Sequence, residues 1–268
     1  MLKQPDSKEY RSAVRVVERL QEAGYRTVLA GGCVRDMLLG REPKDYDIAT
    51  EARPEEVAEI FERTVEVGRQ FGVMRVLLDD HEYEVATFRS ESGYEDGRHP
   101  DRVEFCTPEQ DARRRDFTIN GMFWDAAGDE LIDYVGGCED AMGGVVRTIG
   151  SPRDRFQEDH LRLLRAIRFA ARLGFELEGG TREAVEELAP LATEVAPERL
   201  AQELEVILTD EHPAAALKLM DETGLLEQIL PELSDTKGCE QPNNYHPEGD
   251  VFVHTLLAVD KLGPHPDF

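Results

Sequence analysis

The chain has 268 residues, which is enough for one or two domains with a sizeable core. A hydrophobic content of 40% and a charged content of 32% fit a globular protein, and the sequence shows neither a membrane-spanning apolar run nor a signal-peptide pattern. The four cysteines are scattered without C-x-x-C spacing, so neither a zinc site nor a disulfide framework is indicated. We therefore expect a cytoplasmic protein that does not bind a membrane.

The net charge of −25 admits two interpretations. Proteins that bind nucleic acids usually present a basic face. The acidic surplus is therefore either a solvated surface, with the basic residues gathered locally, or a sign that the chain does not bind RNA. The local distribution favours the first interpretation, because the stretch from Arg147 to Arg172 holds seven arginines and three acids.

The first elements in chain order are a helix, a strand and a second helix. Residues 7–23 have helical periodicity with an apolar stripe, and a short apolar strand is predicted over 27–30. Gly31 and Gly32 then precede a predicted helix over 34–39. A glycine pair at a helix start leaves backbone N–H groups uncovered, and a phosphate anion binds well there.

A second strand is predicted to carry Asp45 and Asp47. Residues i and i+2 of a strand point to the same face, so these two carboxylates would repel each other unless a cation lay between them. Mg²⁺ meets that need together with substrate phosphates. A phosphate site and a metal site in one short unit form the arrangement that a nucleoside triphosphate and two metals require for in-line displacement.

The letters around these residues, G-G-x-V-R-D-x-L-L-G-R and then K-D-Y-D-I-A-T, closely resemble the signature of class II tRNA nucleotidyltransferases and bacterial poly(A) polymerases. These belong to the DNA polymerase β-like nucleotidyltransferase superfamily. The resemblance extends from about Tyr25 to about Leu233. A lone glycine pair or D-x-D is also found in turns and solvated strand ends, so the combined order and spacing carry the resemblance. It implies that the two glycines and Arg35 contact the nucleotide and that the acidic pair holds Mg²⁺.

Two further strands are predicted over 71–78 and 83–88, and the second contains Glu84. The resemblance places a third acid there, which could complete a metal shell or accept the proton of an attacking hydroxyl. The alternative is an exposed strand glutamate. Residues 89–105 are polar and contain glycine, which is typical of a mobile loop, and we expect this loop to end in a strand. This stretch resembles a loop associated with adding the final adenosine in CCA-adding relatives, with matching residues Tyr94, Asp96, Arg98 and His99.

Residues 111–120, DARRRDFTIN, resemble a further family motif. Arg115 could bind a triphosphate with two parallel hydrogen bonds, which a lysine does less well. Asp116 is expected to hold such an arginine in place. The alternative is a helix-terminal charge cluster. Residues 124–149 then read as a glycine-rich β segment that closes the first domain.

A second domain is predicted from residue 151, beginning with a helix over 158–172. Asp159 and Arg162 are three residues apart and share a helical face, and Arg165 and Arg168 continue it. The plain interpretation is a surface salt bridge. The resemblance implies instead that E-D-x-x-R reads the incoming base and that these arginines bind the nucleotide. A carboxylate and a guanidinium match the amine donor and ring-nitrogen acceptor of cytosine and adenine, but not uracil or guanine.

Further helices are predicted over 181–191, 198–208 and 213–223. In the second of these, Arg199 and Glu203 resemble a motif that supports the base-reading helix, with helix-surface charges as the alternative. Residues 245–262 resemble the opening of an HD-type phosphohydrolase module, in which His254 would match the first metal-binding histidine. No H-D dyad follows in this sequence, so we assign no hydrolase activity.

The expected fold class is α+β. A nucleotidyltransferase head with a small mixed sheet spans 1–150, an all-helical neck 151–210, and the start of a helical body with a truncated HD-like module 211–268. The expected function is template-independent addition of CMP and AMP from CTP and ATP to the tRNA 3′ end, with Mg²⁺ as cofactor. Alternatives are a poly(A) polymerase, a CC-only or A-only adding enzyme, and a non-catalytic RNA-binding regulatory module. The sequence leaves the oligomeric state open.

Overall fold

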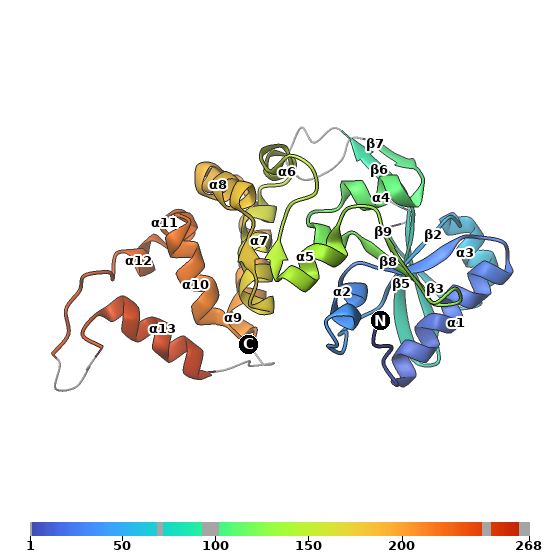
Figure 1. Ribbon diagram of the computed structural model, residues 1–268, viewed down its shortest axis with the longest axis horizontal. Coiled ribbons are helices and arrows are strands. Elements are labelled where there is room, and N and C mark those ends of the chain that lie inside the picture. The colour runs from blue at the N-terminus through green and yellow to red at the C-terminus, as the bar shows by residue number, and fades with distance from the viewer. Residues whose placement is uncertain (1, 69–71, 93–101, 243–247, 263–268) are drawn as a thin grey trace. The chain divides into compact units, whose positions relative to one another are not determined.

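The computed structural model describes residues 2–68, 72–92, 102–242 and 248–262 (Figure 1). The chain forms two compact units. Unit 1 comprises residues 1–143 and 147–149, and unit 2 comprises residues 144–146 and 150–268. The short excursion into unit 2 is β10 (Val145–Val146), which pairs in parallel with β11 (Glu176–Leu177). The further division at residue 210 stays a prediction.

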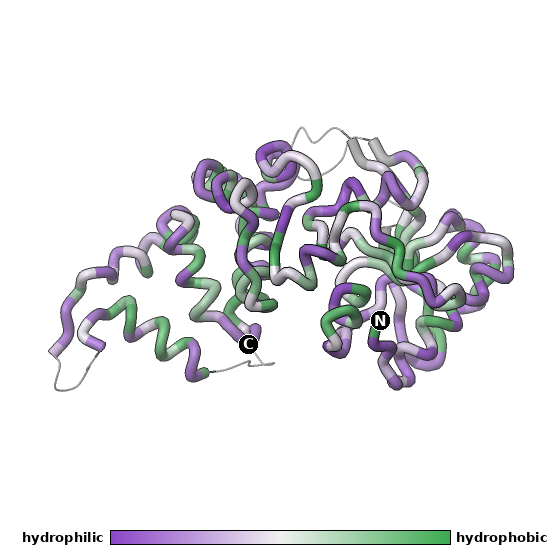
Figure 2. The backbone as a smooth tube through the Cα atoms, in the orientation of Figure 1, coloured by the Kyte–Doolittle hydropathy of each residue, from purple (hydrophilic) through white to green (hydrophobic). Residues whose placement is uncertain are grey.

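Unit 1 is built on a mixed seven-stranded sheet, which confirms the predicted fold class. Neighbouring strands run antiparallel, except that β2 and β5 run parallel. Figure 2 shows hydrophobic residues gathered along the strands of this sheet. In their order across the sheet the strands are β3 (Thr64–Gly68), β4 (Val73–Leu78), β5 (His81–Thr87), β2 (Asp47–Thr50), β1 (Thr27–Ala30), β8 (Met122–Asp125) and β9 (Glu130–Asp133).

One sheet face is apolar and packs on α1 (Lys8–Glu22) and α3 (Pro54–Ile60). Ser7 caps α1, since its hydroxyl accepts the N–H of Tyr10. Tyr83 of β5 is buried under α1 and donates its hydroxyl proton to the Glu9 carbonyl at 2.9 Å. Ile48 and Val85 pair in register on this face and are also buried. Because side chains alternate along a strand, the residues beside them point to the opposite face.

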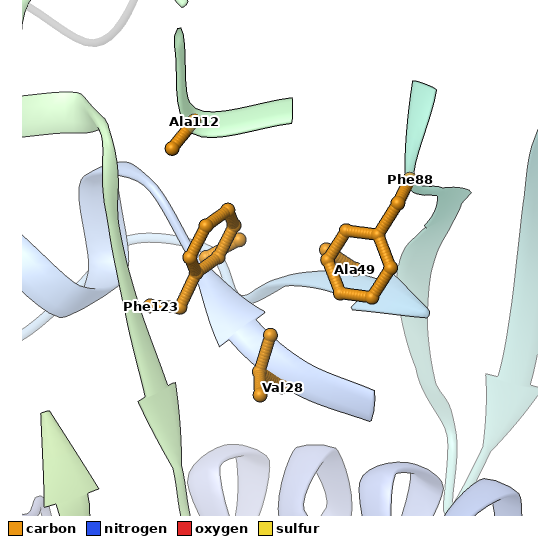
Figure 3. Close-up of a cluster of buried hydrophobic side chains, with 6 residues drawn as sticks. Val28, Ala49, Phe88, Ala112 and Phe123 are labelled. Atoms are coloured by element: carbon orange, nitrogen blue, oxygen red, sulfur yellow. The ribbon is translucent and has the colours of Figure 1, made fainter. Parts of the chain in front are cut away.

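The opposite face carries a compact hydrophobic cluster over part of its area (Figure 3). Ala112 of α4 (Pro108–Arg114) packs there against residues of β1, β2 and β8. Phe88 and Phe123 meet edge to face, with ring centroids 5.9 Å apart. Burying each ring stabilises the fold by about 2–3 kcal/mol. The cluster thus fixes α4 on the sheet face to which Asp47 also points.

The remaining elements of unit 1 lie around the ends of the strands (Figure 1). They are α2 (Gly32–Leu38), the hairpin of β6 (Arg89–Ser92) and β7 (Arg102–Phe105), the 3₁₀ turn η2 (Thr118–Asn120) and α5 (Gly137–Gly143). Gly137 packs directly on η2, because a Cβ there would lie 2.1 Å from the Thr118 carbonyl oxygen. This close approach explains why glycine is required at the start of α5.

Unit 2 is almost entirely helical, as predicted. Its helices are α6 (Pro152–Glu158), α7 (Leu161–Leu173), α8 (Gly179–Leu188), the 3₁₀ helix η3 (Ala189–Glu194), α9 (Pro197–Thr209), α10 (Pro213–Glu222), α11 (Leu225–Ile229), α12 (Pro231–Ser234) and α13 (Val251–Leu262). Gly174 ends α7 in the left-handed conformation that favours glycine. Within the described ranges, no helix is both long and apolar enough to cross a membrane.

The continuous helix predicted over 158–172 is wrong at its start. The chain leaves α6 after Glu158, passes through Asp159 in an extended conformation, and re-enters a helix at Leu161. The cause is local, since the Asp159 carboxylate accepts the N–H of Leu161 at 3.1 Å and so satisfies a donor that the first turn of α7 leaves open.

Candidate functional site

Asp47, the first residue of β2, is a carboxyl group whose surroundings raise its pKa. Desolvation by the surrounding chain raises the pKa of Asp47 to about 6, and the carboxylate of Asp45 adds to this rise. The Arg115 guanidinium acts in the opposite direction, and Glu84 makes a smaller raising contribution. Because the Asp47 side chain still reaches solvent, a cation could approach it and relieve the repulsion.

Asp45 does not lie in a strand, so the prediction of two aspartates on one strand was wrong in its geometry. β2 begins at Asp47, and Asp45 belongs to the irregular segment before it. Between them, Tyr46 is buried with its ring centroid 5.7 Å from that of Tyr10. This anchor leaves both aspartates exposed on either side. Asp45 is nonetheless close enough to raise the pKa of Asp47.

Glu84 lies on β5, the strand beside β2. Ile48 and Val85 are register partners, so Asp47 and Glu84, each one residue earlier, are neighbours across the two parallel strands. The Glu84 side chain is 52% exposed and forms an ion pair with Arg75 at 3.4 Å. The sheet therefore brings the third predicted acid beside Asp47, and it keeps this acid accessible.

Gly31 is required by its contacts as well as by its backbone. Its φ of +74° disfavours any side chain, and a Cβ there would lie 2.9 Å from Arg115 Nη1 and 3.9 Å from Asp47 Oδ2. Its N–H donates to the Met122 carbonyl at 3.1 Å and so is engaged within the fold, contrary to the expectation of an uncovered donor. The N–H of Gly32, at the first position of α2, has no acceptor within the helix.

Arg115 is held by Asp111, not by Asp116 as expected. Its Nε and Nη2 lie 3.2 and 3.1 Å from Oδ2 of Asp111, and Arg114 binds the other carboxylate oxygen at 2.9 Å. Burial works to raise the pKa of Asp111, but the two guanidinium groups outweigh it and hold that pKa below its usual range. The spacing of Asp111 four residues before Arg115 on a helix could have revealed this pair in the sequence.

Asn120 connects Arg115 with Arg35, and sequence reasoning missed it. Its carbonyl accepts Arg115 Nη1 at 3.3 Å, and its side-chain oxygen accepts Arg35 Nη1 at 2.7 Å. Asp116 in turn accepts the Asn120 amide at 3.1 Å. Arg35 is only 3% exposed and also pairs with Asp36 at 2.8 Å. Its guanidinium is therefore engaged inside the fold, and its contact with a nucleotide stays a prediction.

Asp45 and Asp47 suit a divalent cation as two of its ligands, but they are not a complete set of protein ligands. No group of three histidine, cysteine, aspartate or glutamate residues in the described part of the chain is arranged to hold a metal by itself. Asp45 and Asp47 supply the charge, and the pKa of Asp47 stays raised, through burial first and Asp45 second, although Arg115 acts to lower it. Mg²⁺ characteristically takes one or two carboxylates and completes its shell with water and substrate phosphates.

In unit 2, Asp159 and Arg162 each pair with another residue. Asp159 Oδ2 accepts Arg199 Nη2 of α9 at 2.9 Å, and Arg162 Nη1 donates to Glu158 at 2.6 Å. Arg162 Nη1 also donates to the Arg155 carbonyl at 3.0 Å. The described contacts of Arg162 thus involve one of its three nitrogens, so Nε and Nη2 could donate to a further acceptor.

The later arginines of α7 pair with acids of α9 or stack on an aromatic ring. Arg168 Nε donates to buried Glu203 at 2.6 Å, and its guanidinium lies 4.4 Å from the Phe169 ring centroid. Arg165 lies 5.3 Å from the same ring. Glu203 therefore ties α9 to α7, and Arg199 ties α9 to Asp159 just before α7, in agreement with the support predicted for that motif. Whether Arg165 and Arg168 bind a nucleotide stays a prediction.

Several predicted residues lie outside the described part of the chain. They are the four loop residues Tyr94, Asp96, Arg98 and His99. His254 is described, at the start of α13, where its Nδ1 contacts Glu248.

Two family models match the chain. The poly A polymerase head domain matches residues 27–147, and the probable RNA and SrmB-binding site of polymerase A matches residues 174–236. The first match contains every acidic residue proposed above for unit 1, together with Gly31 and Arg115. The second begins just after α7.

Curated proteins and solved structures agree with these models. The CCA-adding enzyme of Bacillus velezensis is 45% identical over 234 residues, which cover 87% of this chain and 58% of that protein. The CCA-adding enzyme of Bacillus subtilis is 44% identical over 223 residues, covering 83% and 56%. The crystal structure of the Bacillus stearothermophilus CCA-adding enzyme in complex with CTP matches with a TM-score of 0.75 at 40% identity, covering 82% of this chain and 53% of that one. The chain thus spans little more than half the length of these relatives.

Proposed function

The chain belongs to the family of class II tRNA nucleotidyltransferases and bacterial poly(A) polymerases, and on this premise we propose that it adds CMP and AMP from CTP and ATP to the 3′ hydroxyl of tRNA without a template. The observation that carries the proposal is the meeting of Asp47, Arg115 and Gly31 in unit 1. Carboxylates for a cation and a guanidinium for phosphate are the two groups that nucleotidyl transfer needs.

The resident metal of this proposal is a divalent cation, and we propose Mg²⁺ held by Asp45 and Asp47. When bound, such ions lower the pKa of the attacking hydroxyl and stabilise the leaving pyrophosphate. The surroundings of Asp47 support this assignment, because burial raises its pKa, the Asp45 carboxylate adds to this rise, and a bound cation would stabilise the ionised form.

The chain's own residues bind and orient the substrates around this pair. Arg115 already has two donors fixed by Asp111, so its Nη1 edge is oriented beside Gly31 for a phosphate oxygen. We assign the N–H of Gly32 to the same phosphate group, and we assign to buried Arg35 the task of fixing Asn120. Glu84, exposed and beside Asp47, is suited to accept the proton of the primer hydroxyl.

Base selection is proposed for unit 2. Asp159 can only accept hydrogen bonds when ionised, and Arg162 can only donate. Arg199 holds the Asp159 carboxylate and still leaves lone pairs for an exocyclic amine. This combination suits cytosine and adenine. Arg165 and Arg168 add positive charge along α7 for the nucleotide.

We propose that the chain consists of a head over 1–150, a neck over 151–210 and the start of a body over 211–268. CTP and ATP appear in the names of solved CCA-adding structures that resemble this chain, and one with ATP matches with a TM-score of 0.72 at 29% identity, covering 85% of this chain and 55% of that one. These matches favour CCA addition over poly(A) synthesis.

Product lengths test the proposal. The protein should be incubated in Mg²⁺ with tRNA that lacks its 3′ CCA, and with CTP alone, ATP alone or both. Addition of two residues from CTP and a third only when ATP is present is the expected result. Long ATP-dependent tails would identify a poly(A) polymerase, a stop after one nucleotide type would identify a CC-only or A-only enzyme, and no addition with intact RNA binding would favour a regulatory module.

A further inference from the structure

Arg75 lies in one row with two acidic residues of the candidate active site. It is the register partner of Glu84 in the antiparallel pair of β4 and β5. Glu84 is in turn the neighbour of Asp47 across the parallel pair, because each precedes the register partners Val85 and Ile48 by one residue. Side chains at opposed positions of neighbouring strands point to the same face. Arg75, Glu84 and Asp47 therefore follow one another across three strands.

The Arg75 guanidinium bridges two glutamates of β5. Its Nη2 lies 3.4 Å from Oε1 of Glu84, and its Nη1 lies 3.2 Å from Oε2 of Glu82. The two glutamates are two residues apart on one strand and share its face. A planar guanidinium can engage both at once, which the single ammonium of a lysine does less well. Two contacts from one rigid group restrict the Glu84 side chain more than one contact would.

The ion pairs of Arg75 with Glu82 and Glu84 contribute little to the stability of the fold. The side chains of Arg75, Glu82 and Glu84 are 35%, 56% and 52% exposed, and exposed ion pairs contribute little to folding. Without such contacts, the side chain of a glutamate on an exposed sheet face rotates freely around its three side-chain bonds. What the bridge changes is therefore the position of Glu84 relative to Asp47.

We propose that Arg75 is a positioning residue whose guanidinium holds the Glu84 carboxylate in the row beside Asp47, where it acts on the primer hydroxyl. The proposal rests on the nucleotidyl transfer proposed above. Arg75 touches no reacting atom in this role, and its whole effect on turnover passes through Glu84.

A double-mutant cycle tests that statement. Kinetics are measured for wild type, Arg75→Gln, Glu84→Gln and the double variant, with CTP and a fixed tRNA primer. Arg75→Gln should lower kcat about tenfold and change KM for CTP less than about twofold, because the triphosphate is bound elsewhere. The double variant should be no slower than Glu84→Gln alone, since a residue that acts only through Glu84 has nothing left to position.

Two variants separate positioning from general damage. Arg75→Lys should recover part of the lost kcat, because an ammonium can still reach Glu84. Arg15→Gln is the matched control, since Arg15 forms an exposed ion pair with Asp79 in the same unit. This control should leave kcat unchanged.

Mn²⁺ binding by the nucleotide-free protein gives a readout without turnover. Arg75→Gln should tighten Mn²⁺ binding about threefold, because Glu84 is released toward the cation and a nearby positive charge is lost. Most of this gain should vanish in the Glu84→Gln background. The proposal would be overturned if Arg75→Gln lowered kcat by the same factor with and without Glu84. A fully active Glu84→Gln variant would also overturn it. So would an equal gain in Mn²⁺ affinity on Arg75→Gln in the wild-type and the Glu84→Gln backgrounds. A wild-type chain without transferase activity would contradict the proposed function instead, and the Mn²⁺ cycle would still decide the role of Arg75.

Discussion

Asp111 and Arg115 form a two-point contact, in which Nε and Nη2 of the guanidinium lie 3.2 and 3.1 Å from one carboxylate oxygen. Asp111 is 1% exposed, and Arg115 lowers the pKa of Asp47. Buried Asp111 in α4 therefore fixes the orientation of the Arg115 guanidinium. This guanidinium in turn acts on Asp47, the candidate catalytic carboxylate.

Asp111→Asn should weaken both the fold and the activity. Removing the charge of a buried acid that binds two arginines should lower the free energy of unfolding by about 3 kcal/mol. It should also lower kcat/KM for CTP at least about tenfold, because Arg115 loses its orientation. Urea unfolding can be followed through Trp124, the single tryptophan, which lies in β8 of unit 1. Glu109→Gln is the matched control, since Glu109 forms an exposed pair with Arg113 on the same helix. Equal behaviour of the two variants would contradict the prediction.

Gly31→Ala and Gly24→Ala should differ, although both glycines have positive φ. The backbone cost is shared, at about 1 kcal/mol. A Cβ at Gly24 would meet nothing within 4 Å, whereas one at Gly31 would lie 2.9 Å from Arg115 Nη1. We therefore expect kcat/KM for CTP to fall at least about tenfold in Gly31→Ala alone. Thermal melting and initial rates of both variants check this. If the two lose activity equally, the contact with Arg115 has no part in the reaction.

Asp47→Asn should stabilise the metal-free protein at neutral pH. The folded pKa of Asp47 is raised from 3.8 to about 6. Its contribution to stability is therefore fully present below about pH 4 and is lost as the pH rises through 6. Because the side chain is exposed, we expect a gain of only about 1 kcal/mol at pH 7.5, which disappears near pH 4.

Melting curves in a chelator at pH 4.5 and 7.5 measure this gain. Addition of Mg²⁺ at pH 7.5 should then raise the Tm of wild type more than that of Asp47→Asn, since only the wild type keeps the carboxylate. A variant that is less stable than wild type at pH 7.5 in the chelator would show that Asp47 is not strained.

Asp159→Ala should relax the choice of base. The amine of cytosine loses its acceptor, and the carbonyl of uracil loses its repulsion. A charge-assisted hydrogen bond of roughly 1.5–3 kcal/mol corresponds to about one to two orders of magnitude in the ratio of kcat/KM for CTP to that for UTP. Arg162→Ala should instead lower the use of both CTP and ATP.

Arg199→Gln is the matched control for Asp159, because it removes the partner at 2.9 Å and keeps the carboxylate. Its CTP-to-UTP ratio should fall less than that of Asp159→Ala. If Asp159→Ala retains the wild-type ratio, the residue only joins α7 to α9 and the base is read elsewhere.

Local patterns predicted much of unit 1, but the β segment predicted over 124–149 was wrong in part, since it contains the helix α5 (Gly137–Gly143). The strand over 27–30 is found as predicted, because a short apolar run ends at a glycine pair. The acids Asp47 and Glu84 come together because β2 and β5 are neighbours. That pairing is not local, so it followed from the resemblance and not from periodicity.

Three further contacts involve polar side chains, which the apolar periodicity of the sequence does not report. Asp111 was missed as the partner of Arg115 because the motif offered Asp116 at closer range. The break at Asp159 was missed because apolar spacing continues across it, while its carboxylate bonds the Leu161 N–H. Asn120 has no periodic signal, since it lies in a single 3₁₀ turn and its contact with Arg35 spans 85 residues of the chain.

The most direct test of the central claim is incorporation of radiolabelled CMP into tRNA lacking its 3′ CCA. Wild type, Asp45→Ala and Asp47→Ala are compared in Mg²⁺, with unfolding curves for each. We predict that wild type incorporates label and that both variants lose at least about 100-fold in rate while unfolding cooperatively. Near-normal incorporation by both variants would contradict the placement of the active site at these two carboxylates.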